Sequence, residues 1–224
     1  MSTTSSGPAT VILGALALLA LTPPSAQAQA TSRTCVGQAG ETPGPACLVA
    51  HQDIGAPAQG PLYWTIYTFA DAQAAERARP PQGVVVQAFG RVWLFDVGGK
   101  GPELEGGRHL ADVGPLPMDA TQGELSAEYL KSTFAPGATA PVHVHSGPEA
   151  FYAISGASCL ETPDGVQIAR GAGHSLMVRP GPPMLLMAIG QETRQGFALI
   201  LHGQGSPPTT LTSAWTPKGL CPKD

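Results

Sequence analysis

Two histidines and one glutamate, His143, His145 and Glu149, lie within a seven-residue window of a short apolar segment, APVHVHSGPEAFYAIS. Histidines two positions apart on an extended strand project to the same face, and a carboxylate four residues later returns to that face after a tight turn. Two imidazoles and one carboxylate form a ligand set that suits a divalent transition metal. The sequence therefore predicts a metal site here, with Fe, Mn, Zn, Ni or Cu as the candidate ions.

The elements that would position these ligands are short apolar segments separated by turns. The chain has 28 Gly, 23 Pro and only 12% charged residues, a composition typical of short strands rather than helical bundles. From residue 125 onward, eight such segments follow one another: 125–134, 141–145, 149–155, 157–161, 166–169, 174–179, 184–189 and 196–202. Eight short strands with turns between them predict a sandwich or a barrel.

The part of the chain before residue 125 has a different composition. After a Gly/Pro-rich lead, residues 62–69 are aromatic and β-branched and predict a strand. Residues 70–79 are rich in Ala, Glu and Arg and predict a helix that Pro80 ends. Residues 84–89 and 91–96 predict a hairpin, and residues 97–122 are expected to be loop-like.

The segment from Gly137 to Gly156 resembles the first motif of the cupin superfamily at every fixed position, G-x5-H-x-H-x3-E-x6-G. The resemblance implies an all-β fold, the cupin double-stranded β-helix or jelly-roll barrel, over residues 116–224, with the metal inside it. Residues 31–115 would then form a small α+β N-terminal extension of strand, helix and hairpin. A degenerate second cupin module is the alternative for that part of the chain.

The second cupin motif, G-x5-P-x-G-x2-H-x3-N, is matched only in part from Gly173 onward. Arg179 stands at the usual Pro, Met184 at the usual fourth ligand His, and Ala188 at the usual Asn. A thioether suits Cu(I) but is a poor ligand for harder ions, so Met184 is interpreted either as pocket packing or as a copper ligand.

Three functions remain open at this point. The first is a metal protein whose barrel holds a small molecule in an apolar pocket lined by Phe151, Ala153 and Leu186, with the reaction unassigned. The second is a metal-dependent oxygenase or isomerase acting on a small organic substrate. The third is a metal-free protein that binds a small ligand. The sequence reveals no general base, because His51 and His109 fall in loop-like stretches and His202 is interpreted as the end of a strand.

The first 30 residues resemble a signal peptide. They contain an uncharged apolar run at residues 9–21, followed by Pro23 and Pro24 and by small-x-small sites ending at Ala28 or Ala30. We therefore expect an exported protein, periplasmic or extracellular, without a stable membrane anchor. With a net charge of −4 and no basic run, nucleic acid is excluded as a partner, and a homodimer is an open alternative.

All four cysteines follow the proposed cleavage site, and an even number in an exported chain favours disulfides. Four cysteines allow three pairings, and the sequence does not choose among them. We favour Cys35 with Cys47 and Cys159 with Cys221, and buried thiols are the alternative.

Overall fold

The computed structural model describes residues 1–2, 35, 46–57, 59–118 and 123–222, so nearly all of the expected signal peptide lies outside the described residues. The described chain contains fourteen strands and one helix, α1 (Ala72–Ala78). None of its helices is long and apolar enough to cross a lipid bilayer.

The strands form four antiparallel sheets. The central sheet has the order β1 (Ala46–Gly55), β6 (Leu125–Phe134), β13 (Arg194–Gly203), β8 (Glu149–Ser155) and β11 (Ser175–Val178). A second sheet has the order β10 (Gly165–Arg170), β9 (Ala157–Thr162) and β12 (Leu185–Ile189), and a ribbon joins β14 (Thr209–Leu211) to β7 (His143–His145). The N-terminal sheet has the order β3 (Val84–Ala88), β4 (Arg91–Gly98), β2 (Tyr63–Phe69) and β5 (Gly107–Val113).

The central sheet and the sheet β10-β9-β12 enclose an apolar interior. Phe151 on β8 and Leu176 on β11 share one buried cluster with Leu160 on β9 and Leu186 on β12. Burying these side chains fully stabilises the fold by about 1.5 to 3 kcal/mol each. The predicted all-β barrel is confirmed.

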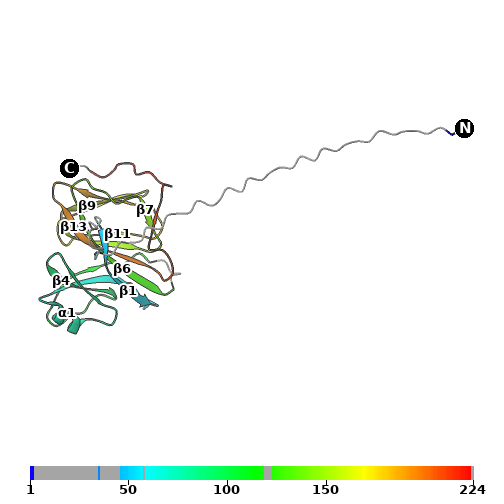
Figure 1. Cartoon of the computed structure of the whole chain (residues 1–224). Coiled ribbons are helices and arrows are strands. Elements are labelled where there is room, and N and C mark those ends of the chain that lie inside the picture. Colours follow the sequence, from blue (N-terminus) through cyan, green and yellow to red (C-terminus); the bar gives the residue numbers. More distant parts are fainter. Residues whose placement is uncertain (3–34, 36–45, 58, 119–122, 223–224) are drawn as a thin grey trace.

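The N-terminal sheet packs on the outer face of the central sheet (Figure 1). Trp64, Trp93 and Phe95 share a buried cluster with Tyr129 on β6 and Phe197 on β13. The Phe95 ring stacks on Tyr129 with centroids 5.3 Å apart and meets Phe197 edge-on at 4.9 Å. Residues from both sides of position 115 therefore contribute to one core.

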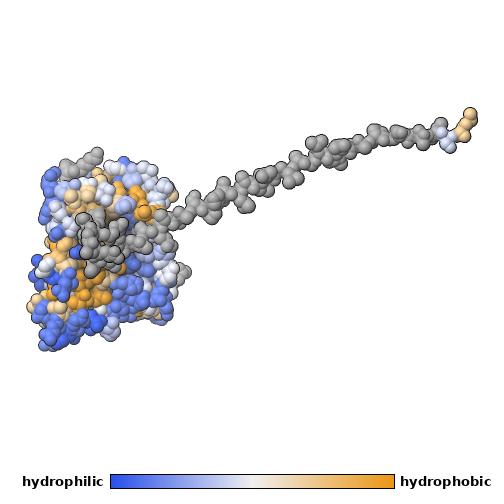
Figure 2. Space-filling model, viewed as in Figure 1, coloured by the Kyte–Doolittle hydropathy of each residue, from blue (hydrophilic) through white to orange (hydrophobic). Residues whose placement is uncertain are grey.

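Helix α1 covers the other face of the N-terminal sheet, at the lower end of the molecule in Figure 1. Asp71 caps its first turn by accepting a hydrogen bond from the Ala74 N–H at 2.8 Å. Figure 2 shows this end as hydrophilic, whereas hydrophobic residues reach the surface nearer to β4 and β6. The helix predicted at 70–79 is confirmed.

Three strands were missed by the sequence interpretation. β5 lies inside residues 97–122, which were expected to be loop-like, and it pairs with β2 at an edge of the N-terminal sheet. β1 follows the Gly/Pro-rich lead and pairs with β6, and β14 pairs with β7. Because β1 and β5 are flanked by glycines, their composition resembles that of loops. Consequently His51 and His109 lie on strands and not in loops.

Both favoured disulfides are present, Cys35–Cys47 and Cys159–Cys221, and the described residues contain no free cysteine. The second one ties the C-terminal segment to β9. Glu161 on the same strand accepts hydrogen bonds from the backbone N–H groups of Lys218 at 2.5 Å and Leu220 at 3.0 Å. The C-terminal segment is thus held to the barrel by a covalent bond and by a buried carboxylate.

The two disulfides should contribute unequally to stability. Their sequence separations are 62 residues for Cys159–Cys221 and 12 residues for Cys35–Cys47. The loop-closure model gives about 4 kcal/mol for the longer loop and about 3 kcal/mol for the shorter one. We expect Cys159→Ala with Cys221→Ala to lower the free energy of unfolding in urea more than Cys35→Ala with Cys47→Ala. An equal or reversed order would contradict this loop-length account.

Candidate metal centre

The three predicted ligands come from two adjacent segments of the barrel. His143 and His145 lie on β7, and Glu149 is the first residue of β8. Between them, Gly147 packs against β13 so closely that a Cβ would lie 1.8 Å from the Leu201 carbonyl oxygen. Only glycine fits this turn, and the turn is what returns the carboxylate to the histidine face.

The structure brings these three side chains together. One ligand atom from each of His143, His145 and Glu149 lies within 4.8 Å of the others, and all three residues are buried. The two imidazole rings are nearly perpendicular, at 82°, with centroids 4.6 Å apart. Among the described residues, no other group of three such side chains is close enough to hold an ion.

Backbone carbonyl groups orient both imidazoles. Nδ1 of His143 lies 2.6 Å from the Pro141 oxygen, and Nδ1 of His145 lies 2.9 Å from the Pro208 oxygen. A carbonyl oxygen can only accept, so Nδ1 carries the proton in each neutral ring and Nε2 carries the lone pair. This arrangement is typical of metal-ligating histidines. Pro208 directly precedes β14, so the missed strand β14 positions this second carbonyl.

The remaining ligand atoms lack ordinary partners. Nε2 of His145 and Oε2 of Glu149 are both buried and lie 2.9 Å apart. Neither atom has a hydrogen-bond partner among the described residues. Leaving a buried polar atom unsatisfied costs about 1 to 3 kcal/mol. Two such atoms beside the Nε2 of His143 are the donor set that a divalent transition metal would use, so the residues fit the implied metal.

Comparison with protein families agrees with this geometry. Residues 130–192, which contain all three ligands, match the cupin domain. This part of the barrel therefore matches a cupin domain, in agreement with the cupin resemblance of its first motif. Comparison with curated proteins gives no match.

Several solved structures resemble part of this chain. An oxalate oxidase is 18% identical with a TM-score of 0.32, over 39% of this chain and 46% of that one. A DMSP lyase from Ruegeria pomeroyi is 16% identical with a TM-score of 0.34, over 38% and 43%. A double-stranded β-helix protein from Klebsiella pneumoniae is 22% identical with a TM-score of 0.33, over 38% and 70%. This chain spans less than half of the oxidase and the lyase, and likenesses this weak carry no argument about function.

Met184, at the position of the usual fourth ligand, contacts the site through its backbone. It accepts a hydrogen bond from the His143 N–H at 3.3 Å and donates one to the His143 oxygen at 2.9 Å. Its side chain is 1% exposed and belongs to the apolar interior cluster with Phe151 and Leu186. Met184 thus packs in the barrel interior while its backbone pairs with that of His143.

The interior around the predicted pocket residues is not purely apolar. Phe151 and Leu186 pack in the interior cluster, and Ala153 is buried further along β8. Arg194, which is 0% exposed, lies within 6.0 Å of the Phe151 ring and hydrogen-bonds to the hydroxyl groups of Ser132 and Ser158. Burial lowers the pKa of Arg194 to about 10, although nearby Glu149 raises it. A cation therefore lies inside the barrel near the ligand carboxylate.

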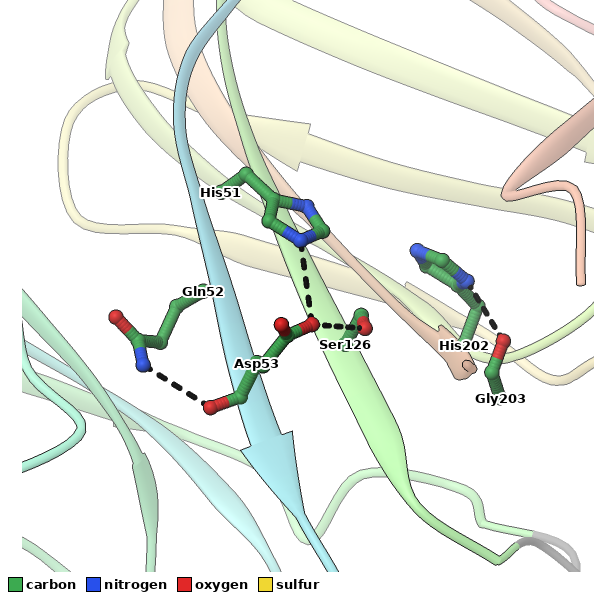
Figure 3. Close-up of polar contacts among 6 residues, drawn as sticks. All are labelled: His51, Gln52, Asp53, Ser126, His202 and Gly203. Carbon is green, nitrogen blue, oxygen red and sulfur yellow. Dashed lines mark hydrogen bonds and ion pairs between the residues drawn. The ribbon is translucent and has the colours of Figure 1, made fainter. Parts of the chain in front are cut away.

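A second polar group, drawn in Figure 3, lies on the same face of the central sheet as Glu149. Asp53 accepts a hydrogen bond from the Ser126 hydroxyl at 2.7 Å and lies 3.3 Å from Nε2 of His51. His202 is paired with Ser126 across the sheet and is only 5% exposed. Its Nδ1 donates to the Gly203 oxygen at 3.0 Å, while its Nε2 is buried and has no hydrogen-bond partner among the described residues.

The sequence interpretation missed this second polar group. On β13, Ile200 is paired with Glu149, so the alternation of side chains places His202 on the ligand face. The sequence of β13 alone shows this alternation of side chains. It does not show which strands lie next to β13. His51 was assigned to a loop, which hid its place beside Asp53.

The two ligand histidines differ in proton affinity. Burial lowers the pKa of His143, and the adjacent His145 lowers it further. Burial also lowers the pKa of His145, but the Glu149 carboxylate and the Pro208 carbonyl together raise it above its ordinary value. In the metal-free protein, His145 therefore holds a proton up to a higher pH than His143 does.

These shifts predict how metal affinity depends on pH. Below the raised pKa of His145, an ion must displace a proton, so metal affinity should fall by about tenfold for each unit by which the pH is lowered.

The stability of the metal-free protein should change in the opposite sense, because it should fall as the pH rises. The contribution of protonated His145 is complete below its unfolded pKa and is lost as the pH rises through its raised folded pKa. Chelator competition and urea unfolding from pH 5 to 8 measure both, and a metal affinity independent of pH would exclude His145 as a ligand.

Proposed function

We propose that the cupin domain binds a divalent transition metal through Nε2 of His143, Nε2 of His145 and a carboxylate oxygen of Glu149. The observation that carries this proposal is the convergence of three buried ligand atoms, two of them without hydrogen bonds. Three protein ligands leave coordination positions open to a small molecule. When bound, such an ion supplies Lewis-acid character or an activated water molecule at those positions.

The residues around the ligands would act on a small organic ligand in two ways. The interior cluster with Met184 and Phe151 excludes water from one side of the site. On the other side, Nε2 of His202 is a buried acceptor without a partner, available to a hydroxyl or amine of the ligand. These two features favour the proposal that a small organic molecule is bound, and the reaction remains unassigned.

The open coordination positions also support a second candidate, a metal-dependent oxygenase or isomerase. The specific observation is that Met184, at the place of a fourth ligand, packs in the apolar interior.

We further propose that the protein is exported after cleavage of residues 1–30, for which the two disulfides are supporting evidence.

Metal binding is tested by loading EDTA-treated full-length protein with Mn²⁺, Fe²⁺, Co²⁺, Ni²⁺, Cu²⁺ or Zn²⁺ under conditions that keep iron reduced. We expect about one equivalent of bound metal by elemental analysis and a rise in melting temperature. At a free-ion concentration 100 times Kd, the stabilisation is about 2.7 kcal/mol. His143→Ala and Glu149→Ala should each abolish that rise.

Two control variants sharpen this test. His174→Ala removes an exposed histidine of the same barrel and should leave metal binding unchanged. Met184→Leu removes the thioether at similar volume and should also bind normally. If Met184→Leu alone loses copper binding when copper is added in reduced form, as Cu(I), Met184 would instead be identified as a ligand. Wild-type protein that takes up none of these ions would refute the metal proposal.

Export is tested by expressing the full chain in a bacterium and sequencing the N-terminus of the mature product. Cleavage at the two small-x-small sites predicts a product that begins at Gln29 or Thr31. Retention of Met1 in a membrane-associated product would contradict this proposal.

A further inference from the structure

A cavity of about 660 Å³ lies where the N-terminal sheet meets the outer face of the central sheet. It is lined by the end of β2, the turn between β3 and β4, β5 and the Lys131 side of β6. The metal ligands do not line it. We call it the basic cleft, defined by three of its lining residues, Arg91, Arg108 and Lys131.

The lining of the basic cleft has an unbalanced charge. Arg91, Arg108 and Lys131 line it, whereas none of its lining residues is Asp or Glu. Within the described residues, none of these three side chains takes part in a hydrogen bond or ion pair. The whole chain carries a net charge of −4 with only 12 Lys and Arg, and three of these cations line this one cavity.

The cations converge on one patch of the central sheet. Phe197 on β13 is paired with Lys131 on one side and with Tyr152 on the other, so the three share the outer face. Burial raises the pKa of Tyr152, and the positive charges of Arg108 and Arg91 lower it. The positive charges are therefore directed to the region around Phe197.

The turn between β3 and β4 supplies an aromatic wall. Phe89 has φ 51°, and it is the one described non-glycine residue with positive φ. Gly90 follows with φ 70°, and this two-residue turn is one in which Asn-Gly is the usual choice. A bulky residue in this conformation is strained. The Phe89 ring lines the cleft and meets Phe197 edge-on, with centroids 5.3 Å apart.

We propose that the basic cleft binds a small organic molecule through a multiply charged oxyanion, a phosphate or polycarboxylate group, with the molecule's apolar part against Phe89. Guanidinium groups bind such oxyanions through paired hydrogen bonds, and Lys131 adds a third positive charge. A volume of about 660 Å³ is in the range of small-molecule sites. This site is separate from the metal centre and does not depend on it.

The test uses full-length protein in EDTA, so that chelation of metal by the probe plays no part. Pyrophosphate and citrate are titrated by calorimetry at constant ionic strength, with acetate as the monovalent comparison. We expect binding of at least one polyvalent probe, weaker by tenfold or more in Arg91→Gln with Arg108→Gln. Preference for pyrophosphate would indicate a phosphate ligand, and preference for citrate a polycarboxylate, each within the proposal.

Matched variants separate a site from a general anion effect. Arg170→Gln removes an exposed arginine of β10 and should bind the probes as the wild type does. His143→Ala should also bind normally, so failure of the metal proposal leaves this result unaffected. Circular dichroism checks that the double variant is folded, and Lys131→Gln is the milder substitute, expected to weaken binding several-fold. Absence of binding at millimolar probe, or equal losses in Arg170→Gln, would overturn the proposal.

Discussion

The structure depends on the burial of the central sheet on both of its faces. Along β8, Ala150 and Tyr152 face the core shared with the N-terminal sheet, whereas Glu149 and Phe151 face the barrel interior. A slip of one residue in the pairing of β8 with β13 would exchange these faces and place the Glu149 carboxylate among the aromatic rings around Phe197. The packing of the N-terminal sheet therefore fixes the register that holds the metal ligands.

Much of the barrel was readable from the sequence because its signals are local. The spacing of His143, His145 and Glu149 depends on one strand and one turn, and the Gly147 that the turn requires lies between them. The expected segments from residue 125 to 202 are short and apolar, and the strands β6 to β13 lie within one or two residues of them. Local composition is sufficient to predict the position of a strand where every strand is buried on at least one face.

The rest could not be predicted because it depends on neighbours distant in sequence. β1 is recognisable only through its pairing with β6, more than 70 residues away, as in His51 opposite Glu128. The sequence likewise could not show that Pro208 supplies a carbonyl to His145, or that His202 lies on the ligand face. Segments before and after residue 115 share one core through tertiary packing. Such packing leaves no periodic pattern in the sequence from which it could be predicted.

The direction from which a ligand would reach the proposed metal centre follows from what surrounds the three candidate ligands. On the side of Met184 and Phe151 the interior is filled by buried apolar side chains, so entry there would require the core to open. On the side of His202, the neighbouring side chains of His51 and Asp53 are 47% and 67% exposed. A solvated polar molecule loses little hydration along this second route, whereas along the first it would contact mainly apolar side chains. Access from the His202 side is therefore favoured, and the polar groups there would be the first to contact an entering ligand.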